Sequence, residues 1–203
     1  MDRLQAMEVF TRVVETNSFS KAAELLDLPR GSVSNLIQDG VDCVIRMGFL
    51  EESSLVARRI GNSRITTCAS PAYLAQYGTP TTLEELQGHR AVNYVSARSG
   101  KVFPFEYQVN GEVVKVTLDG ALAVNDGTVY ITAGVLGYGI IQPSRFMVAD
   151  MIERGELQEI LTEYTIPSTP LSILYPHRRM SSRVRAFTEW ITELANRHPD
   201  LGL

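Results

Sequence analysis

The sequence predicts an α/β protein in which a short, purely helical segment precedes a body of alternating strands and helices. Residues 3–38 show only helical periodicity, whereas from Val41 onward short apolar runs rich in β-branched residues alternate with helical stretches. Such alternation is typical of an α/β body. At 203 residues, with 44% hydrophobic and 21% charged residues, the chain can form one large domain or two small ones.

The helical segment is predicted to contain three helices. Apolar residues repeat with a period near 3.6 through residues 4–14, and Ser20 can cap a second helix. Pro29 then forces a turn, because the residue before a proline is biased away from helical conformation. A third helix begins near Ser32 and has barely two turns before it meets Gly40.

The strands of the body are expected at short apolar runs bounded by turn residues. The Asn110-Gly111 pair is the strongest hairpin-turn signal in the chain. It predicts that residues 103–118 form two antiparallel strands. The other strands are expected over residues 41–48, 58–70, 90–96, 120–125, 138–143, 157–161 and 170–176.

The helices of the body are predicted from capping and stop signals. Ser70 can cap a helix that has Pro71 at its first position, and Gly78 ends it. Thr82 and Glu85 have the spacing of a capping box. Helices are expected over residues 71–78, 81–88, 126–137, 144–155 and 181–198.

Composition and spacing argue against several functional classes. Cys43 and Cys68 lack CxxC spacing and are expected to be buried, reduced thiols. The three histidines are far apart, so we expect no metal site, no cofactor and no enzymatic activity. We find no signal peptide and no membrane span, which favours the cytoplasm. The net charge of −4 gives no overall attraction to nucleic acid.

The helical segment nevertheless has the pattern of a helix-turn-helix. Its third helix presents Ser32, Ser34 and Asn35, which can hydrogen-bond to bases or phosphates, and Lys21 and Arg30 can contact phosphate. Residues 1–38 carry four Lys or Arg against five Asp or Glu. A small helical packing unit without DNA contact therefore remains an equal alternative.

Two strand-to-helix junctions in the body could bind a small ligand. Asn125 and Asp126 stand where a strand leads into a helix N-terminus, a position that favours small anions and polar ligands. Ser70 stands at a similar junction. The alternative, that both are ordinary helix caps, is favoured locally.

Taken together, these stretches resemble the LysR-type bacterial transcriptional regulators. MEVFTRVVETNSFSKAAELLDLPRGSVSNLI resembles the start of their winged helix-turn-helix. GVDCVIRMG, SSLVARRIG, CASPAYLAQYGTP, ALAVNDG, GYGIIQPSRFMVADMIERGEL and LYPHRRMSSRVRAFTEWI resemble their effector-binding domain. The resemblance implies a periplasmic-binding-protein-like α/β fold for this body.

The resemblance also implies an internal deletion, because it jumps at Gln38–Asp39 from the recognition helix to a late strand of the first effector subdomain. The wing, the dimerising linker helix and most of that subdomain are missing. The implied domains are a partial winged helix-turn-helix over 1–38 and an effector-binding domain over 39–203. Residues 63–164 would form an essentially complete second subdomain. Residues 41–48 and 170–198 would be remnants of the first.

The resemblance implies DNA as a partner. The residues that match the DNA-contacting positions are Ser18, Ser20, Lys21, Arg30, Ser32, Ser34 and Asn35. Gly31 and Asn35 depart from the common serine and arginine of the family, and the basic wing is absent. We therefore expect weak or absent specific DNA binding.

The resemblance further implies a small-molecule effector, with a carboxylate as the common chemistry. The matching residues are Arg46, Met47, Ser70, Ser96, Asn125 and Asp126. Arg46 could pair with a carboxylate or be a solvated strand-end charge, with equal weight. We expect exposed apolar surface on the remnant sheet and hence a homo-oligomer. The alternative to a regulator is a small-molecule-binding or dominant-negative interaction module without DNA recognition.

Overall fold

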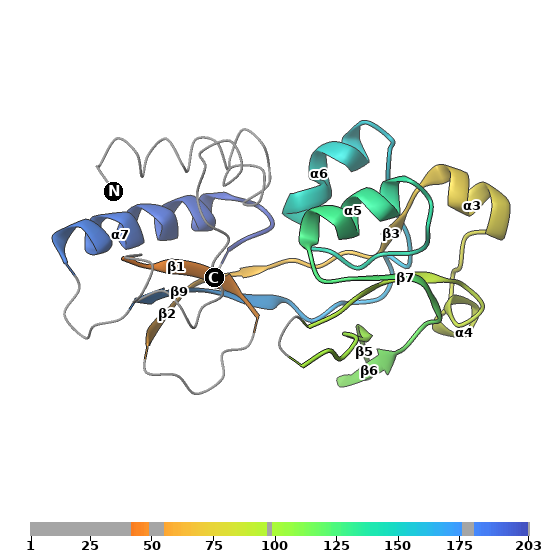
Figure 1. Cartoon of the computed structure of the whole chain (residues 1–203), viewed down its shortest axis with the longest axis horizontal. Coiled ribbons are helices and arrows are strands. Elements are labelled where there is room, and N and C mark those ends of the chain that lie inside the picture. The colour runs from red at the N-terminus through yellow and green to blue at the C-terminus, as the bar shows by residue number, and fades with distance from the viewer. Residues whose placement is uncertain (1–41, 49–54, 97–98, 176–180, 203) are drawn as a thin grey trace. The chain divides into compact units, whose positions relative to one another are not determined.

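The computed structural model describes residues 42–48, 55–96, 99–175 and 181–202, in two compact units (Figure 1). The first unit contains the described residues up to Ser63 and from Ser168 onward, and the second is Arg64–Pro167. The predicted helices of residues 3–38, with all seven candidate DNA-contacting residues, lie outside the described residues.

The first unit is a three-stranded antiparallel sheet with one long helix packed on it. The strand order is β1 (Val44–Met47), β9 (Thr169–Tyr175) and β2 (Val56–Ser63). Helix α7 (Ser182–Arg197) lies along one face of this sheet (Figure 1), where it forms a hydrophobic cluster with the strands. Successive side chains of a strand point to opposite faces, so alternate residues meet the helix.

The central strand of this sheet exposes little apolar surface. Leu171, Ile173 and Leu174 of β9 are 7%, 0% and 2% exposed. Val44 and Ile45 of the outer strand β1 are half-buried. The expectation of exposed apolar surface on the remnant sheet is therefore wrong for β9, because its apolar side chains are buried.

The second unit is built around short strands. Strand β3 (Cys68–Ala69) pairs antiparallel with β8 (Gln158–Glu159), and β4 (Ala91–Tyr94) pairs parallel with β7 (Gly120–Val124). Ile140 and Ile141 connect the two pairs by single bridges, parallel to Ala91 and antiparallel to Cys68.

Helices and a hairpin cover the two faces of these strands. Helices α5 (Gly127–Val135) and α6 (Arg145–Glu153) lie on one side, and the hairpin β5 (Phe105–Val109)–β6 (Glu112–Val116) lies on the other, as Figure 1 shows. The short helices α3 (Pro71–Tyr77) and α4 (Leu83–Leu86) contribute to the hairpin-side core.

Consecutive residues of the short strands enter different cores. Cys68, Val92 and Ile141 belong to the cluster under α5 and α6. Their neighbours Ala69, Ala91 and Ile140 belong to the cluster under the hairpin. The two-residue period of a strand thus divides six neighbouring apolar residues between two cores.

Several local predictions are confirmed. Asn110 and Gly111 have φ values of 53° and 86° and join β5 to β6, as a type I′ turn requires. The Thr82 hydroxyl accepts a hydrogen bond from the Glu85 amide at 3.2 Å. The Glu85 carboxylate bonds instead to the amide and hydroxyl of Thr81, so the capping box closes one residue earlier than expected.

Two strand predictions are corrected. Residues 58–70 were expected to form one strand, but the structure separates β2 from β3. Residues 138–143 were expected to form another, yet only Ile140 and Ile141 make bridges. A Cβ on Gly139 would lie 2.7 Å from the Ala91 carbonyl carbon, so glycine there allows the close backbone approach. Pro143 provides no amide hydrogen to extend the pairing.

Candidate functional site

The carboxyl ends of parallel strands meet at one edge of the second unit. Strands β4 and β7 run parallel, and Ile140 pairs parallel with Ala91 of β4. The residues that follow these three segments, Ser96, Asn125 and Gln142, therefore lie toward the same edge. In α/β sheets this edge is the favoured location of ligand sites.

Asp126 caps helix α5 at this edge. Its Oδ1 accepts hydrogen bonds from the amides of Thr128 and Val129 at 2.9 and 3.0 Å. The side chain of Asn125 is exposed, and its backbone carbonyl accepts a hydrogen bond from the Tyr94 hydroxyl at 3.2 Å. Burial, with the nearby charge of Asp126, raises the pKa of Tyr94 above its ordinary value, which keeps this hydroxyl a donor.

The first turns of α5 and α6 are close together. A Cβ on Gly127 would lie 3.7 Å from Cε of Met147, which is in the first turn of α6. Ser144 is the N-cap residue of α6, although its side chain makes no capping hydrogen bond. Two helix N-termini, which favour negative or electron-rich groups, thus begin at the edge where Asn125 is exposed.

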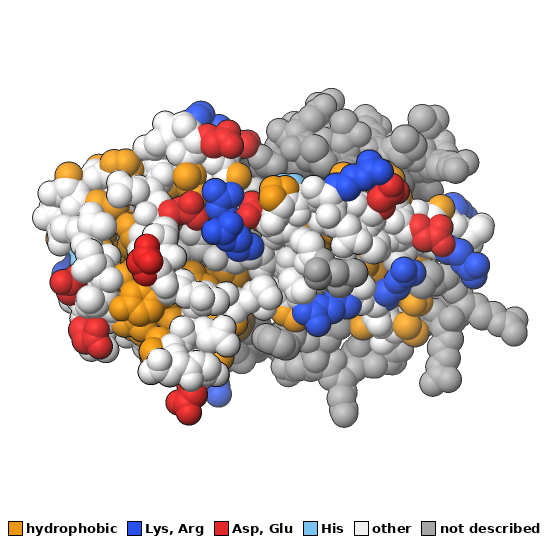
Figure 2. Space-filling model, turned by 180° about the vertical axis from the view of Figure 1, so that it is seen from behind, with side chains coloured by type: hydrophobic (Ala, Val, Ile, Leu, Met, Phe, Trp, Pro, Cys, Tyr) orange, Lys and Arg blue, Asp and Glu red, His pale blue; other side chains and the backbone are white. Residues whose placement is uncertain are grey.

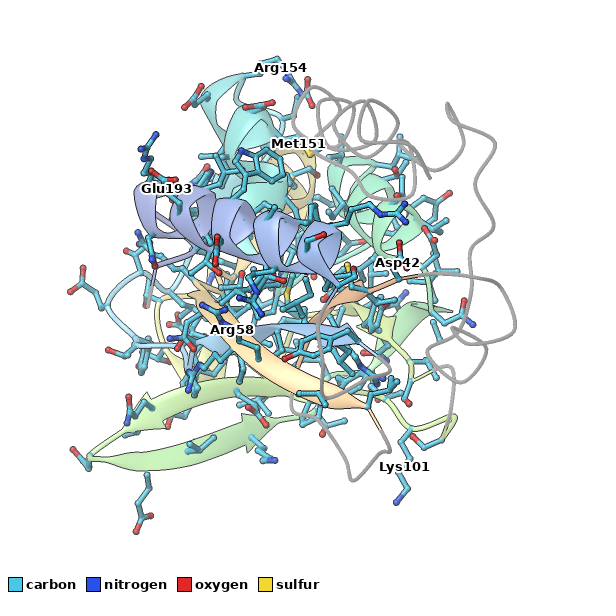
Figure 3. All side chains as sticks on the ribbon, turned by 90° about the vertical axis from the view of Figure 1, so that its left-hand side faces the viewer. Asp42, Arg58, Lys101, Met151, Arg154 and Glu193 are labelled. Atoms are coloured by element: carbon cyan, nitrogen blue, oxygen red, sulfur yellow. The ribbon has the colours of Figure 1, made fainter. Side chains whose placement is uncertain are left out.

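Ser96 is engaged in a turn at the same edge. Its hydroxyl accepts a hydrogen bond from the Ser99 amide at 3.2 Å, and its carbonyl accepts one from Gly100 at 2.8 Å. Figure 3 shows the Lys101 side chain of this turn extending away from the fold. Ser96 is half-buried, so part of its side chain still faces solvent.

Ser70 lies at the opposite edge. Cys68 pairs antiparallel with Ile141, so β3 runs against β4 and its carboxyl end points the other way. The Ser70 hydroxyl caps α3 by accepting from the Tyr73 amide at 3.3 Å. A Cβ on Gly137, just beyond α5, would lie 3.2 Å from that hydroxyl, whereas Asp126 starts the same helix. The structure therefore separates Ser70 from Asn125 and Asp126.

Arg46 and Met47 point to opposite faces of the first unit's sheet. Met47 packs in the cluster under α7, together with Cys43 and Ile45 of the same face. Arg46 is exposed on the other face. Adjacent strand residues alternate, so these two predicted neighbours do not face one common ligand.

A buried hydrogen-bond network supports the candidate edge and was missed by the sequence analysis. The hydroxyls of Thr67 and Tyr107 are 2.9 Å apart, and Nε2 of Gln142 donates to Thr67 Oγ1 at 3.2 Å. Gln142 Oε1 accepts from the Glu106 amide, and the Tyr130 hydroxyl accepts from the Gln142 amide at 2.8 Å. Burial raises the pKa of Tyr107 to about 12. The network links β5 to α5.

An ion pair was also missed. The Arg145 Nε atom lies 3.1 Å from Glu159 Oε1, which also accepts a hydrogen bond from Thr66 Oγ1 at 2.7 Å. The two charged side chains are about one-quarter exposed, at 26% and 22%. This contact ties the first residue of α6 to β8. A sequence offers no signal for it, because Arg145 and Glu159 are 14 residues apart on separate elements and Thr66 lies 93 residues before Glu159.

Neither the cysteines nor any cluster of metal-ligating side chains offers a second site in the described residues. Cys68 is buried, but Cys43 is only half-buried, which corrects the expectation for that thiol. Burial and the neighbouring Asp42 raise the pKa of Cys43 to about 11. Within residues 42–48, 55–96, 99–175 and 181–202 no group of three or more His, Cys, Asp or Glu side chains could hold a metal. In these ranges no helix is long and apolar enough to span a membrane.

Charges of both signs are mixed on the described surface. Figure 2 shows acidic and basic side chains next to one another on the face it presents. This mixture agrees with the net charge of −4 and gives this face no broad electrostatic attraction for nucleic acid.

Two family models match the chain. The model described as the LysR substrate binding domain matches residues 23–196. The model described as a bacterial regulatory helix-turn-helix protein of the lysR family matches residues 4–39. Neither describes a catalytic family.

Curated relatives and solved structures agree with these models. The uncharacterised regulator YhjC of Escherichia coli is 38% identical over 168 residues, which are 82% of this chain and 56% of the relative. A transcriptional repressor of Pseudomonas aeruginosa is 33% identical over 172 residues, 84% of this chain and 54% of the relative. The chain thus spans about half the length of these relatives.

The regulatory domain of CrgA, a LysR-type regulator of Neisseria meningitidis, has a similar structure. It aligns with a TM-score of 0.72 and 25% identity, over 95% of this chain and 94% of that domain.

Proposed function

The chain belongs to the LysR family of bacterial regulators, and from this premise we propose that it is a shortened regulator whose α/β body binds a small-molecule effector. The observation that carries the proposal is the edge of the second unit where β4 and β7 end. There the exposed Asn125 side chain stands beside the Asp126 cap, with the half-buried Ser96 at the end of the neighbouring strand. These groups can hydrogen-bond to a small polar molecule.

The buried network behind this edge supports the same proposal. Tyr130 of α5 accepts a hydrogen bond from the Gln142 amide, and the Gln142 side chain bonds to Thr67. A ligand site needs residues held in place by a rigid second layer of contacts. The network supplies such support to α5, whose N-terminus Asp126 caps.

We further propose that specific DNA recognition is impaired. The helix-turn-helix match ends at Asp39, and Gly40 follows it directly. A regulator of this type reads two half-sites through a dimer that spaces its recognition helices. The proposed domains are 1–38 for the partial DNA-binding unit and 39–203 for the effector-binding unit, with 63–164 as the second subdomain.

A second candidate function follows from the implied internal junction at Gln38–Asp39, where the wing and the dimerising linker helix are absent between the two matched blocks. The candidate is a small-molecule-binding or dominant-negative interaction module without DNA recognition. Such a protein would pair with an intact relative and block its function.

The ligand proposal is tested by thermal unfolding of the purified chain with a panel of small carboxylic acids and neutral polar metabolites. A compound that binds the folded state raises the midpoint by an amount that grows with the ratio of its free concentration to its Kd. Asn125→Ala and Ser96→Ala should each reduce the increase. Thr132→Ala, at an exposed position further along α5, serves as the matched control. If a stabilising compound acts equally on all three variants, the proposed edge is not its site.

The DNA proposal is tested by selecting genomic fragments with the purified chain at about 50 and 200 mM salt, concentrations between which phosphate contacts weaken strongly. We expect weak retention that salt abolishes and no enriched sequence. Arg30→Gln should lower this retention, and Arg58→Gln should not. Enrichment of one sequence that survives the higher salt would contradict the proposal and also exclude the second candidate function.

A further inference from the structure

The strand register of the first unit places two arginines on either side of one serine. Arg46 of β1 and Arg59 of β2 are both paired with Ser172 of the central strand β9. Directly paired residues of antiparallel strands point to the same face of a sheet. Arg46, Ser172 and Arg59 therefore form a row across the sheet.

This row lies on the face opposite to helix α7. Leu171 and Ile173, the neighbours of Ser172, pack in the cluster with Ile191 of α7. Ser172 therefore points away from that helix. Arg58 is paired with Ile173 and so belongs to the α7 face, although it adjoins Arg59 in the chain. Figure 3 labels Arg58 beside β2 and Asp42 beside β1, at the two outer strands of the sheet.

The two guanidinium groups of the row are open to solvent. Arg46 and Arg59 are both exposed, whereas Ser172 is only 4% exposed. Arg59 donates a hydrogen bond from Nη2 to the Asn62 side chain, which leaves its other donors free to bind. No ion pair of Arg46 or Arg59 with a carboxylate is found within the described part of the chain.

The spacing suits one ligand held between two cations. Paired Cα atoms of antiparallel strands are about 4.5–5.5 Å apart, so the two arginine Cα atoms are about 10 Å apart. An extended arginine side chain reaches about 7 Å from its Cα. Both guanidinium groups can thus meet above Ser172. The central strand is hydrogen-bonded on both sides, so the positions of the three Cα atoms are held by the sheet.

We propose that Arg46 and Arg59 bind one oxyanion, a carboxylate or a phosphate, between them above Ser172. A guanidinium group presents paired donors that match the oxygens of either anion. The Ser172 hydroxyl lies at the floor of the row and can donate to a third oxygen. The inference extends the effector-binding role expected for Arg46 and rests on it, and it adds Arg59 and Ser172 as partners.

The test follows amide signals by NMR while the full chain is titrated with sodium benzoate and, separately, with inorganic phosphate. Sodium chloride at matched ionic strength is the blank. The signals of Arg46, Arg59 and Ser172 should shift with saturation. Binding by benzoate alone assigns a carboxylate ligand, and binding by phosphate alone assigns a phosphate ligand.

Three charge-removing variants distinguish binding between Arg46 and Arg59 from non-specific attraction of the anion to positive charge. Arg46→Gln and Arg59→Gln should each weaken binding about fivefold, as expected for losing one exposed charged contact. Arg58→Gln removes the same charge from the adjacent residue on the other face, and should weaken binding less than about twofold. Equal weakening by all three variants, or no saturating shift with either anion, would overturn the inference.

This test is independent of the edge proposed for the second unit. The signals that report binding belong to β1, β2 and β9, and no variant touches Asn125 or Ser96. If anions bind at the arginine row but Asn125→Ala does not change thermal stabilisation, the site proposed at the edge of the second unit is rejected and the arginine site is retained. If Asn125→Ala reduces thermal stabilisation but no anion binds at the row, only the arginine site is rejected.

Discussion

Replacing Thr67 by valine tests whether the buried network holds the second unit together. Thr67 is 1% exposed and Tyr107 is 0% exposed, so water cannot replace the bond between their hydroxyls. Valine has nearly the same shape as threonine but neither donates nor accepts. The substitution therefore breaks two hydrogen bonds, one to Tyr107 and one to Gln142 Nε2.

The expected loss can be estimated bond by bond. The Tyr107 hydroxyl loses its hydrogen bond to Thr67, at a cost of about 1–3 kcal/mol. Gln142 Nε2 keeps a second hydrogen bond, to the Glu106 carbonyl. Losing its bond to Thr67 therefore costs only about 1 kcal/mol. The added methyl group returns roughly 0.8 kcal/mol through burial. The free energy of unfolding should fall by about 2 kcal/mol.

A double-mutant cycle with Tyr107→Phe isolates the bond between the two hydroxyls. Tyr107→Phe alone should cost about 1 kcal/mol, because Thr67 retains Gln142 as a partner. Once either hydroxyl is gone, removing the other should cost less. The double variant should therefore be more stable than the sum of the single effects predicts, by about 1 kcal/mol.

Urea unfolding followed by near-ultraviolet circular dichroism of tyrosine reports on the second unit, since Tyr175 is the only one of the eight tyrosines outside it. Fluorescence of Trp190 in α7 reports on the first unit and provides the internal control. If the effects of the two single substitutions sum to the effect of the double substitution within about 0.3 kcal/mol, the two hydroxyls are not coupled and the reasoning is refuted.

The remaining predictions concern protonation, thiols and backbone packing. Burial lowers the pKa of His89 below its ordinary value, with Glu85 opposing the shift, so the folded state binds fewer protons. His89 thus contributes stability above about pH 6.5 that is lost as the pH falls below it, and His89→Gln should reduce this loss in melting curves from pH 7.5 to 5. With a pKa of about 11, Cys43 should react slowly with a disulfide reagent at pH 7.5, and the buried Cys68 only on unfolding; fast reaction of both thiols in the native protein would contradict this. Gly139→Ala should destabilise by about 2 kcal/mol in urea, since the new Cβ would lie 2.7 Å from backbone atoms of Arg90 and Ala91. Gly88→Ala, whose Cβ has an ordinary 3.4 Å contact, should be nearly neutral, and equal effects would argue against the backbone clash.

Local chemistry made much of the fold predictable from the sequence. The Asn110-Gly111 turn needs two residues that tolerate positive φ, and both have it. The caps at Ser70 and Asp126 depend on side chains that bond within three residues. Such features use only neighbouring residues, so a single sequence contains all the information they need.

The arrangement of the candidate site could not be predicted in this way. Ser70 and Asp126 follow the same strand, cap and helix pattern, but β3 and β7 run in different directions, so the two caps lie at opposite edges. Strand direction depends on long-range pairing. The network around Gln142 joins residues up to 75 positions apart, and no sequence pattern near Gln142 predicts it.

Arg46 and Met47 illustrate a different limit. Both match the expected effector positions, yet a strand turns adjacent side chains to opposite faces. Only the pairing with Ser172 shows which face each side chain takes and which residue is its counterpart. Family resemblance places residues along the chain, but the register of the sheet decides which of them can meet.

The division of neighbouring strand residues between two cores has a consequence for how this chain tolerates insertions and deletions. Cys68 and Ala69 serve different cores, as do Ala91 and Val92, and Ile140 and Ile141. Losing one residue within any of these pairs would turn every following side chain of that segment into the wrong core. Losing a whole block of chain between elements would leave each pair in phase. A protein of this construction can therefore survive the removal of a long segment more easily than the removal of one amino acid.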